Sequence, residues 1–339
     1  MRSTINIEKP ADLVAYLVGR GNLSAVESPK IRPLHGGVSN RTVLVQPENG
    51  SPFVVKQALQ CLRVATDWFS PPERISVEAM GMKYLRKILP KGTVTQLLFE
   101  DHDNHIIAMS AVPQPHSTWK EMLLTLPPEA SSFEQFAEIL SRLHRGSYNN
   151  TQLARVFSDT QYFESLRLRP YYEFTARQFP DVRSRIKQLA RQALKHKLCL
   201  VHGDFSPKNI LVHCGQFVLL DHEVIHYGDP AFDIGFSLTH LLAKAINRRQ
   251  FASEFADSTR QFVLRYLEGL PNAISVDLEP RACGHTLACL LARVAGQSTL
   301  EYLAKPERER IKLVALQLFE RPPTSLLNLV DHFSEEANA

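Results

Sequence analysis

Apolar residues in the first hundred positions gather in short runs separated by turn residues. Between residues 31 and 57 we predict three strands, joined by HGGVSN and then by PENGS, where Asn49-Gly50 is typical of a hairpin turn. After Pro71-Pro72 apolar residues recur at helical spacing: Ile75, Ala79, Met82, Leu85 and Leu89. Two more strands are expected around residues 95–100 and 105–112. This pattern predicts an N-terminal lobe with an antiparallel sheet and one main helix.

The spacing changes beyond VPQPH, residues 112–116, a stretch with two prolines that we interpret as a linker. Amphipathic helices are predicted over residues 133–144 and 182–196, and most of the chain that follows is also expected to be helical. A chain of 339 residues is long enough for two lobes. We therefore predict an α+β protein with an N-terminal lobe at residues 1–112 and a larger, mostly helical lobe at residues 113–339.

Polar residues stand between two apolar runs in the stretch VHGDFSPKNILV. The runs, 198–201 and 210–212, are predicted to be buried strands, so the polar residues fall in a loop, where binding and catalytic groups are common. Asp204 and Asn209 are five residues apart, with His202 before them, as in the catalytic loop of kinases. In that loop the Asp accepts the proton of an attacking hydroxyl and the Asn binds Mg²⁺. For any single residue, an ordinary polar turn is the alternative.

Four charged residues elsewhere favour the same chemistry. Lys56 ends the strand FVVK, and Glu78 lies on the apolar side of the predicted helix, where a carboxylate is costly unless it is paired. We expect the two side chains to face one another, although either charge could instead extend to solvent. Asp221 and Glu223 are two apart at the end of a strand, so their oxygens can point to one side and bind a hard cation.

The turn HGGVSN is rich in glycine and lies between two predicted strands. Backbone N–H groups in such a turn can bind phosphates, and the candidate residues are Gly36, Gly37 and Ser39. The turn matches neither the P-loop motif nor the complete dinucleotide-binding motif. Two adjacent glycines usually only form a turn, so this signal is weak by itself.

Composition narrows the possible partners and location. A net charge of +4 is too small for this length to favour nucleic acid, and no apolar run is long enough to cross a membrane. The N-terminus lacks the apolar core of a signal peptide. The five cysteines are scattered and odd in number, which indicates reduced thiols and neither disulfides nor zinc. We expect a cytoplasmic protein that binds neither nucleic acid nor a membrane.

Three stretches, HGDFSPKNILV, LLDHE and GDPAFDIG, together resemble the aminoglycoside phosphotransferase and choline kinase family of small-molecule kinases. The resemblance covers about residues 31–305. In the N-terminal part, FVVKQALQCLR with Trp68, Arg74 and Glu78 resembles methylthioribose kinase, a likeness that does not extend to Asn209. The family resemblance implies a two-lobed, protein-kinase-like fold. It also implies that the N-terminal lobe binds ATP (or GTP) and that the C-terminal lobe binds the acceptor.

Carried over to this chain, the resemblance assigns a role to each candidate residue. Asp204 would be the catalytic base, with Asn209 and Asp221 as Mg²⁺ ligands and Glu223 as an additional carboxylate near the metal. A second set would hold the nucleotide phosphates, with Lys56 paired to Glu78 and the turn contributing backbone groups. Two residues would be structural: His202 within the catalytic loop and Asp233 as the buried acid that braces it.

These features lead to two hypotheses of function. The first is an enzyme that transfers the γ-phosphoryl group of a nucleotide to a hydroxyl of a small molecule; the second is a nucleotide-binding pseudokinase with a regulatory or scaffold role. The chain lacks the D-F-G and A-P-E motifs, which argues against a protein substrate. A sugar, an amino alcohol and an aminoglycoside all remain possible acceptors. Arg293 in RVAGQS could face the acceptor or lie on a helix surface.

Overall fold

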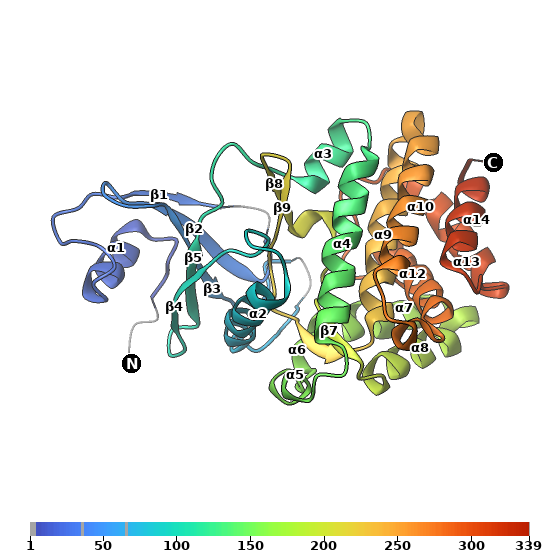
Figure 1. Cartoon of the computed structure of the whole chain (residues 1–339), viewed down its shortest axis with the longest axis horizontal. Helices are drawn as coiled ribbons and strands as arrows, with labels where there is room; N and C mark the ends of the chain where they lie inside the picture. Colours follow the sequence, from blue (N-terminus) through green and yellow to red (C-terminus); the bar gives the residue numbers. More distant parts are fainter. Residues whose placement is uncertain (1–4, 35–36, 65–66, 339) are drawn as a thin grey trace. The chain divides into compact units, whose positions relative to one another are not determined.

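The computed structural model describes residues 5–34, 37–64 and 67–338 (Figure 1). The described chain divides into two compact units. The N-unit contains the residues up to Pro115 together with Leu220–Glu223, and the C-unit contains His116–Leu219 and the residues from Val224 onward. The short segment Leu220–Glu223 therefore belongs with the N-unit, although it lies far beyond the linker in sequence.

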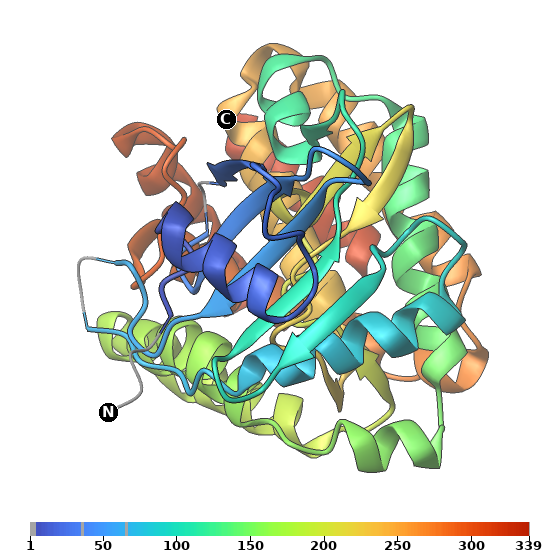
Figure 2. The same ribbon diagram turned by 90° about the vertical axis from the view of Figure 1, so that its left-hand side faces the viewer.

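The N-unit is built on a five-stranded antiparallel sheet of described residues (Figure 2). All five strands predicted from the sequence pattern are present. In spatial order they are β1 (Lys30–Pro33), β2 (Asn40–Gln46), β3 (Phe53–Ala58), β5 (Ile106–Ser110) and β4 (Leu97–Asp101). All neighbouring strands of this sheet pair in the antiparallel direction, and β3 lies at its centre.

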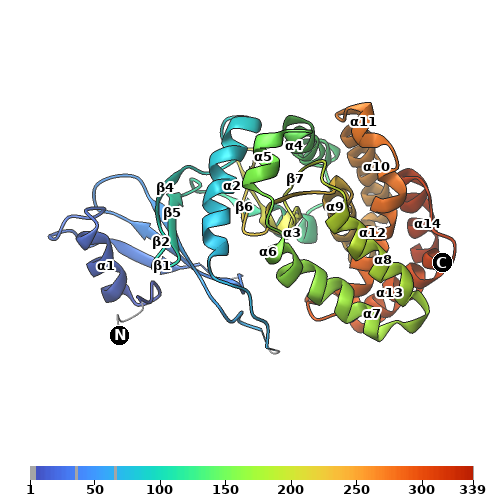
Figure 3. The ribbon, with the colours of Figure 1, turned by 90° about the horizontal axis from the view of Figure 1, so that it is seen from below.

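Two helices cover opposite faces of this sheet (Figures 1 and 3). Helix α1 (Pro10–Gly19) packs Leu13 and Leu17 into a core that includes Val55 of β3. Helix α2 (Arg74–Ile88) lies on the other side and buries the apolar stripe predicted from the sequence. Because side chains alternate along a strand, Lys56 of β3 points away from α1 and toward α2.

The C-unit is mainly helical, as expected. Helices α4 (Ala130–Ser147), α9 (Pro230–Asn247), α10 (Ala252–Glu268) and α12 (Leu278–Ala295) form its centre. The predicted helices correspond to α4 and to α8 (Arg183–Lys195). The other helical segments are α3 (Trp119–Thr125), α5 (Thr151–Val156), α6 (Gln161–Phe163), the π-helix η1 (Glu164–Glu173), α7 (Phe174–Gln178), η2 (Pro180–Val182), η3 (Pro207–Asn209), η4 (Arg249–Phe251), α11 (Asn272–Ser275), α13 (Lys305–Glu320) and α14 (Leu326–Asn338). Among the helices described, none has the length and apolar character needed to span a membrane.

Short strands frame the polar loop of the C-unit. Strand β7 (Cys199–Val201) pairs with β10 (His226–Gly228), and β8 (Ile210–His213) pairs with β6 (Ser117–Thr118) and β9 (Gln216–Leu219). β7 is buried throughout, as predicted. A strand is present at residues 210–212 as predicted, but only Ile210 is buried and the rest of β8 is partly buried. Strands β7 and β8 therefore fix the two ends of the loop formed by residues 202–209.

Candidate active site

Lys56 lies at the centre of a charged cluster in the N-unit. Its Nζ donates to Glu78 Oε1 at 2.6 Å and to Asp221 Oδ1 at 2.9 Å. The ion pair predicted from the faces of strand β3 and helix α2 is therefore present. The contact to Asp221 joins residues 165 positions apart in the chain, because the segment after β9 packs with the N-unit.

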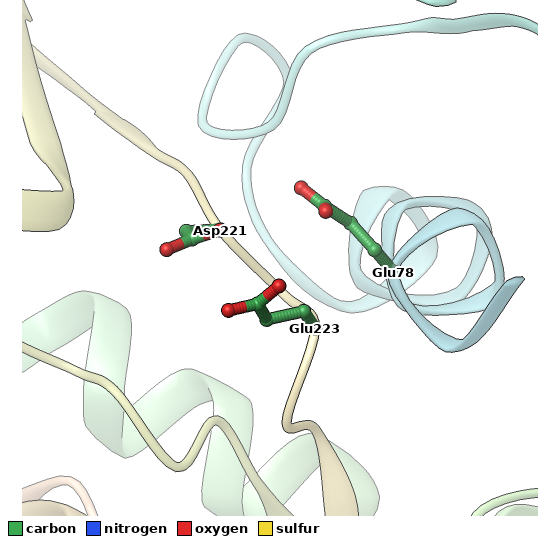
Figure 4. Close-up of side chains that lie close together, drawn as sticks. All are labelled: Glu78, Asp221 and Glu223. Carbon is green, nitrogen blue, oxygen red and sulfur yellow. The ribbon is translucent and has the colours of Figure 1, made fainter. Parts of the chain in front are cut away.

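Three carboxylates lie close to one another in this cluster, as Figure 4 shows. Glu78 projects from α2, while Asp221 and Glu223 come from the segment that follows β9. One oxygen from each of these described residues lies within 4.8 Å of the others. Carboxylate oxygens are the ligands that Mg²⁺ prefers, so the donor set fits this cation.

Negative charge dominates this cluster. Burial by itself would lower the pKa of Lys56, but the carboxylates of Asp221, Glu78 and Glu223 outweigh it and raise that pKa above its ordinary value. Burial raises the pKa of Glu78 toward neutrality, and the neighbouring carboxylates add to this effect, while Lys56 opposes it. Two cations, Lys56 and Arg74, contact these three carboxylates, so the cluster carries a net negative charge when all three are ionised, and this charge favours a further cation.

Asp221 has an unusual backbone conformation. Its φ of +66° lies in the left-handed region, which costs most residues about 1 kcal/mol or more but is tolerated best by Asn and Asp. Such conformations persist where the surroundings fix them, and they cluster at functional sites. Here the bond from Lys56 holds the carboxylate of Asp221 in the cluster.

Arg74 links the carboxylate cluster to the end of the glycine-rich turn. The guanidinium is fully buried and donates through Nε to Glu223 at 3.0 Å. It also donates to the carbonyls of Ser39 and, at 2.8 Å, Leu59. The side chain of Asn40 donates to the same oxygen of Glu223 at 2.9 Å. The sequence indicates no chemical role for Arg74; its signals are its position beside the apolar stripe of α2 and its part in the resemblance to methylthioribose kinase.

The glycine-rich turn is described in part. Gly36 lies outside the described residues. Gly37 is exposed, whereas Ser39 is buried and its hydroxyl accepts a hydrogen bond from Asn40 at 3.1 Å. The bonds made by Asn40 and Arg74 place the C-terminal end of the turn next to Glu223. Phosphate binding by this turn remains a prediction.

The C-unit brings Asp204 and Asn209 together. Asn209 Nδ2 donates to Asp204 Oδ2 at 2.7 Å and to the Asp204 carbonyl at 2.9 Å. Since the amide nitrogen is used in these bonds, the amide oxygen is the atom available to a cation. Arg167 Nη2 forms an ion pair with the same Oδ2 at 3.0 Å. The sequence does not indicate a role for Arg167, since no motif surrounds it.

Asp233 fixes the loop that contains Asp204. It is fully buried and accepts the backbone N–H groups of His202 at 2.6 Å and Gly203 at 2.8 Å. His144 contacts it at 3.2 Å. Burial would raise the pKa of Asp233, but the histidines and the Gly203 N–H together lower it. His202, also buried, accepts the N–H of Asp204 through Nδ1 at 3.2 Å.

Gly203 gives the loop its path. Its φ of +76° lies in the left-handed region, and a Cβ at this position would lie 2.8 Å from Val224 Cγ2. Both the conformation and the close approach require glycine. The sharp turn at Gly203 directs the backbone N–H groups of His202 and Gly203 toward Asp233. The side chain of Asp204 instead contacts Arg167 and Asn209.

The candidate residues thus form two groups, one in each unit. In the N-unit an ammonium group and three carboxylates gather beside a glycine-rich turn, and in the C-unit a braced loop presents an aspartate and an asparagine. This combination of an antiparallel sheet, a lysine–glutamate pair and a helical unit with that loop defines a protein-kinase-like fold. The chain belongs to the phosphotransferase enzyme family, whose model matches residues 30–270.

The kinases that this chain matches in sequence are distant relatives, with identities below 30%. The methylthioribose kinase of Pectobacterium atrosepticum is 26% identical over 268 residues, which is 70% of this chain and 62% of that enzyme. Methylthioribose kinase 2 of Oryza sativa subsp. japonica is 22% identical over 293 residues, or 76% of this chain and 68% of that enzyme. The chain therefore spans less than two thirds of the length of the Pectobacterium kinase that it matches.

Solved structures with the same fold cover nearly the whole chain. A choline/ethanolamine kinase family protein from Mesorhizobium loti is 15% identical, with a TM-score of 0.54 over 97% of this chain and 99% of that one. The ethanolamine kinase of Plasmodium vivax is 12% identical, with a TM-score of 0.55 over 98% and 89% of the two chains. An amicoumacin kinase bound to AMP-PNP and Ca²⁺ is 14% identical, with a TM-score of 0.54 over 94% and 96%. At these identities the similarity establishes the protein-kinase-like fold.

Proposed function

We propose that this protein transfers the γ-phosphoryl group of ATP (or GTP) to a hydroxyl group of a small molecule, with Mg²⁺ as cofactor. The observation that supports this most strongly is the double contact of Lys56 with Glu78 and Asp221. These residues come from three separate stretches of the sequence, and their meeting is what a nucleotide phosphate and metal site requires. The solved relative that holds AMP-PNP supports the choice of nucleotide.

The N-unit supplies groups that bind and orient phosphates. In this proposal Lys56 contacts the phosphates, and Glu78 fixes the direction of its ammonium group. Asp221 and Glu223, with Asn209, offer oxygens to Mg²⁺, which would neutralise charge on the transferred group when bound. Arg74 donates to one oxygen of Glu223 and so offsets part of the cost of burying that carboxylate.

The C-unit supplies the base. Arg167 and Asn209 both donate to Oδ2 of Asp204. Among the contacts of the described residues, none occupies Oδ1, and this oxygen is therefore the one that we assign to accept the proton of the acceptor hydroxyl. The brace from Asp233 holds the loop still, which is required because catalysis of phosphoryl transfer depends on positioning.

The test is a coupled assay of ADP release with a panel of small hydroxyl compounds. With an active acceptor, Asp204→Asn should reduce kcat by about 10²- to 10⁴-fold, because the side-chain shape is kept and the proton acceptor is lost. Nucleotide affinity should stay the same, since Asp204 is not assigned to the metal. As a matched control, Asp257→Asn changes an exposed aspartate of the same unit and should leave turnover unchanged.

Two further variants separate this mechanism from the alternatives. Asn209→Ala and Asp221→Ala should weaken binding of the Mg²⁺–nucleotide complex as well as turnover, because both are assigned as metal ligands. If Asp204→Asn keeps wild-type turnover, the assignment of the base is wrong. If the protein binds nucleotide but none of the compounds in the panel causes ADP release, the result favours the pseudokinase hypothesis over the proposed activity.

A further inference from the structure

A cluster of cationic side chains lies in the C-unit, away from the residues assigned above. We call it the basic cluster: Lys120 of α3, Lys244 of α9, Arg293 of α12 and the ring of Tyr302. Lys244 is only 1% exposed. Its Nζ lies 5.1 Å from the centre of the Tyr302 ring and 3.4 Å from the carbonyl oxygen of His240. Lys120 Nζ lies 6.0 Å from the centre of the same ring.

Lys244 is a buried cation without a carboxylate partner among the described residues. The acid that acts on its pKa is Glu301, whose ion pair is with Lys120. Burial, together with the positive charges of Lys120 and Arg293, lowers the pKa of Lys244 to about 7, while Glu301 opposes this shift. A buried, unpaired ammonium group is costly, and proteins rarely retain one without a use for it.

Two neighbouring groups also have polar atoms without a partner. Arg293 donates through Nη1 to the carbonyl and hydroxyl of Ser298, both at 2.8 Å, and Nη2 is 3.5 Å from His240 Nε2. Within the described residues, the buried Nε of Arg293 and the buried hydroxyl of Tyr302 have no hydrogen-bond partner. Nearly all buried polar atoms in proteins are satisfied, so unsatisfied donors beside a buried lysine indicate a missing acceptor. An oxyanion is an acceptor whose charge matches the cations of this cluster.

The basic cluster connects to Asp204 through packed side chains of the same unit. The guanidinium groups of Arg293 and Arg167 lie 5.5 Å and 5.8 Å from the centre of the Tyr171 ring. Arg167 in turn pairs with Asp204. Tyr171 and Arg167 lie in the π-helix η1, a rare conformation that occurs frequently at functional sites. Contacts through Tyr171 and Arg167 therefore link Arg293 to the proposed base.

We propose that the basic cluster binds an oxyanion of the acceptor, and that the acceptor is a small hydroxyl compound with a carboxylate or phosphate group. This inference rests on the proposed function, whose acceptor it specifies. Lys244 and Arg293 would hold the oxyanion with charge-assisted hydrogen bonds, and the Tyr302 hydroxyl would donate a third. A cationic acceptor, such as an amino alcohol or an aminoglycoside, would be repelled by the same groups.

The charges around Lys244 also predict how binding depends on pH. Lys120, Arg293 and Glu301 are the charged groups that act on it, and His240 beside it stays neutral, because burial and the surrounding cations hold its pKa well below the ordinary value. An oxyanion would raise the pKa of Lys244, so binding at about pH 8 should take up a proton. Affinity should be highest below about pH 7 and should fall as the pH rises above it.

The first experiment compares acceptors in the ADP-release assay. The panel pairs anionic compounds (glycerate, gluconate, glycerol 3-phosphate, ribose 5-phosphate) with neutral ones (glycerol, ribose) and cationic ones (choline, kanamycin). We expect turnover with anionic members. The carboxylate and phosphate arms of the panel show which oxyanion is preferred. Turnover confined to neutral or cationic compounds overturns the inference while leaving the proposed kinase activity intact.

The second experiment changes the basic cluster. With an anionic acceptor, Lys244→Met and Arg293→Met should each raise KM about 10- to 100-fold and leave the affinity for nucleotide unchanged. Lys244→Met should also unfold at the same or a higher temperature than the wild type, because it removes a buried unpaired charge. Lys195→Met, at an exposed position of α8, removes the same charge and should change neither KM nor stability. An unchanged KM in both cluster variants refutes the assignment, and so does a large loss of stability in Lys244→Met without a rise in KM.

A binding measurement tests the site even if no acceptor is turned over. Inorganic phosphate and glycerate are titrated calorimetrically into protein saturated with Mg²⁺ and a non-hydrolysable ATP analogue, in buffers of different ionisation enthalpy. We expect binding with proton uptake at about pH 8, lost in the Lys244→Met, Arg293→Met double variant. Such binding without any ADP release would support the anion site and contradict the proposed activity. Failure of both anions to bind the wild type, or equal binding by the double variant, overturns the inference.

Discussion

Replacing Lys56 by Met removes the one ammonium group that contacts two of the three clustered carboxylates. The lysine is buried and lies 2.6 Å from Glu78 and 2.9 Å from Asp221. Met has nearly the same volume, so packing is kept and the change is chiefly electrostatic. Breaking a buried ion pair by removing one partner costs about 3–5 kcal/mol, because the remaining charge is left uncompensated. We expect the N-unit to lose about this much free energy of unfolding at a pH slightly above neutral.

The two tryptophans make this measurement specific to the N-unit. The chain contains Trp68 in the N-unit and Trp119 in the C-unit. In a Trp119→Phe background, fluorescence during urea unfolding reports on the unit that contains Trp68. Lys83→Met, on α2 of the same unit, is the control, since Lys83 pairs with Glu100 at an exposed position. Exposed ion pairs contribute about 0–1 kcal/mol, so this variant should unfold close to the parent.

Magnesium and Glu78 provide two further checks on the same reasoning. Millimolar Mg²⁺ should restore more stability to Lys56→Met than it adds to the parent protein, because the variant has a larger excess of negative charge. Glu78→Gln should cost less than Lys56→Met, because Lys56 keeps its bond to Asp221 and a carboxylate is neutralised. The electrostatic reasoning fails if Lys56→Met unfolds no more easily than Lys83→Met, or if Mg²⁺ stabilises variant and parent equally.

Three other measurements test the C-unit loop and the thiols. Gly203→Ala should destabilise the C-unit by about 2–4 kcal/mol in urea unfolding, since it adds strain at positive φ to a clash with Val224; unchanged stability would show that the loop is not fixed as described. Asp233→Asn should cost about 1–3 kcal/mol at neutral pH. The stability due to Asp233 exists above its ordinary pKa of about 3.9 and disappears as the pH falls through the lower native value, so the variant should lose less stability in acid than the wild type. A thiol reagent should modify Cys61 and Cys214 promptly in the native protein and the three buried cysteines only after unfolding, and rapid modification of all five would contradict the burial observed.

The sequence predicted the elements of this protein well because their signals are local. Period-two alternation and turn residues gave the strands of the N-unit, and helical spacing gave α2. The same periodicities placed Lys56 on one face of β3 and Glu78 on the buried face of α2. The pair could then be predicted without a structure, because a buried carboxylate is destabilising unless it is paired with a cation or with hydrogen-bond donors.

Periodicity could not predict which distant charges meet. Arg74 and Glu223 are 149 positions apart, and nothing near either residue in sequence specifies the other. Arg167 contacts Asp204 because η1 packs beside the loop, and π-helical geometry has no recognisable sequence pattern. Both pairings were decided by how separate segments pack, which is a property of the whole fold.

Lys244 shows the same limit most clearly. In the sequence LLAKAIN it resembles an ordinary cation on the solvent side of a helix, which is the usual place for lysine. The structure buries it, because α9 packs against α12 and the ring of Tyr302 covers its ammonium group. The sequence alone therefore determined the local elements, the Lys56–Glu78 pair and the motif around Asp204. Tertiary packing alone decided which cations are buried without partners, because the energy of a buried charge depends on everything around it and very little on its neighbours in the chain.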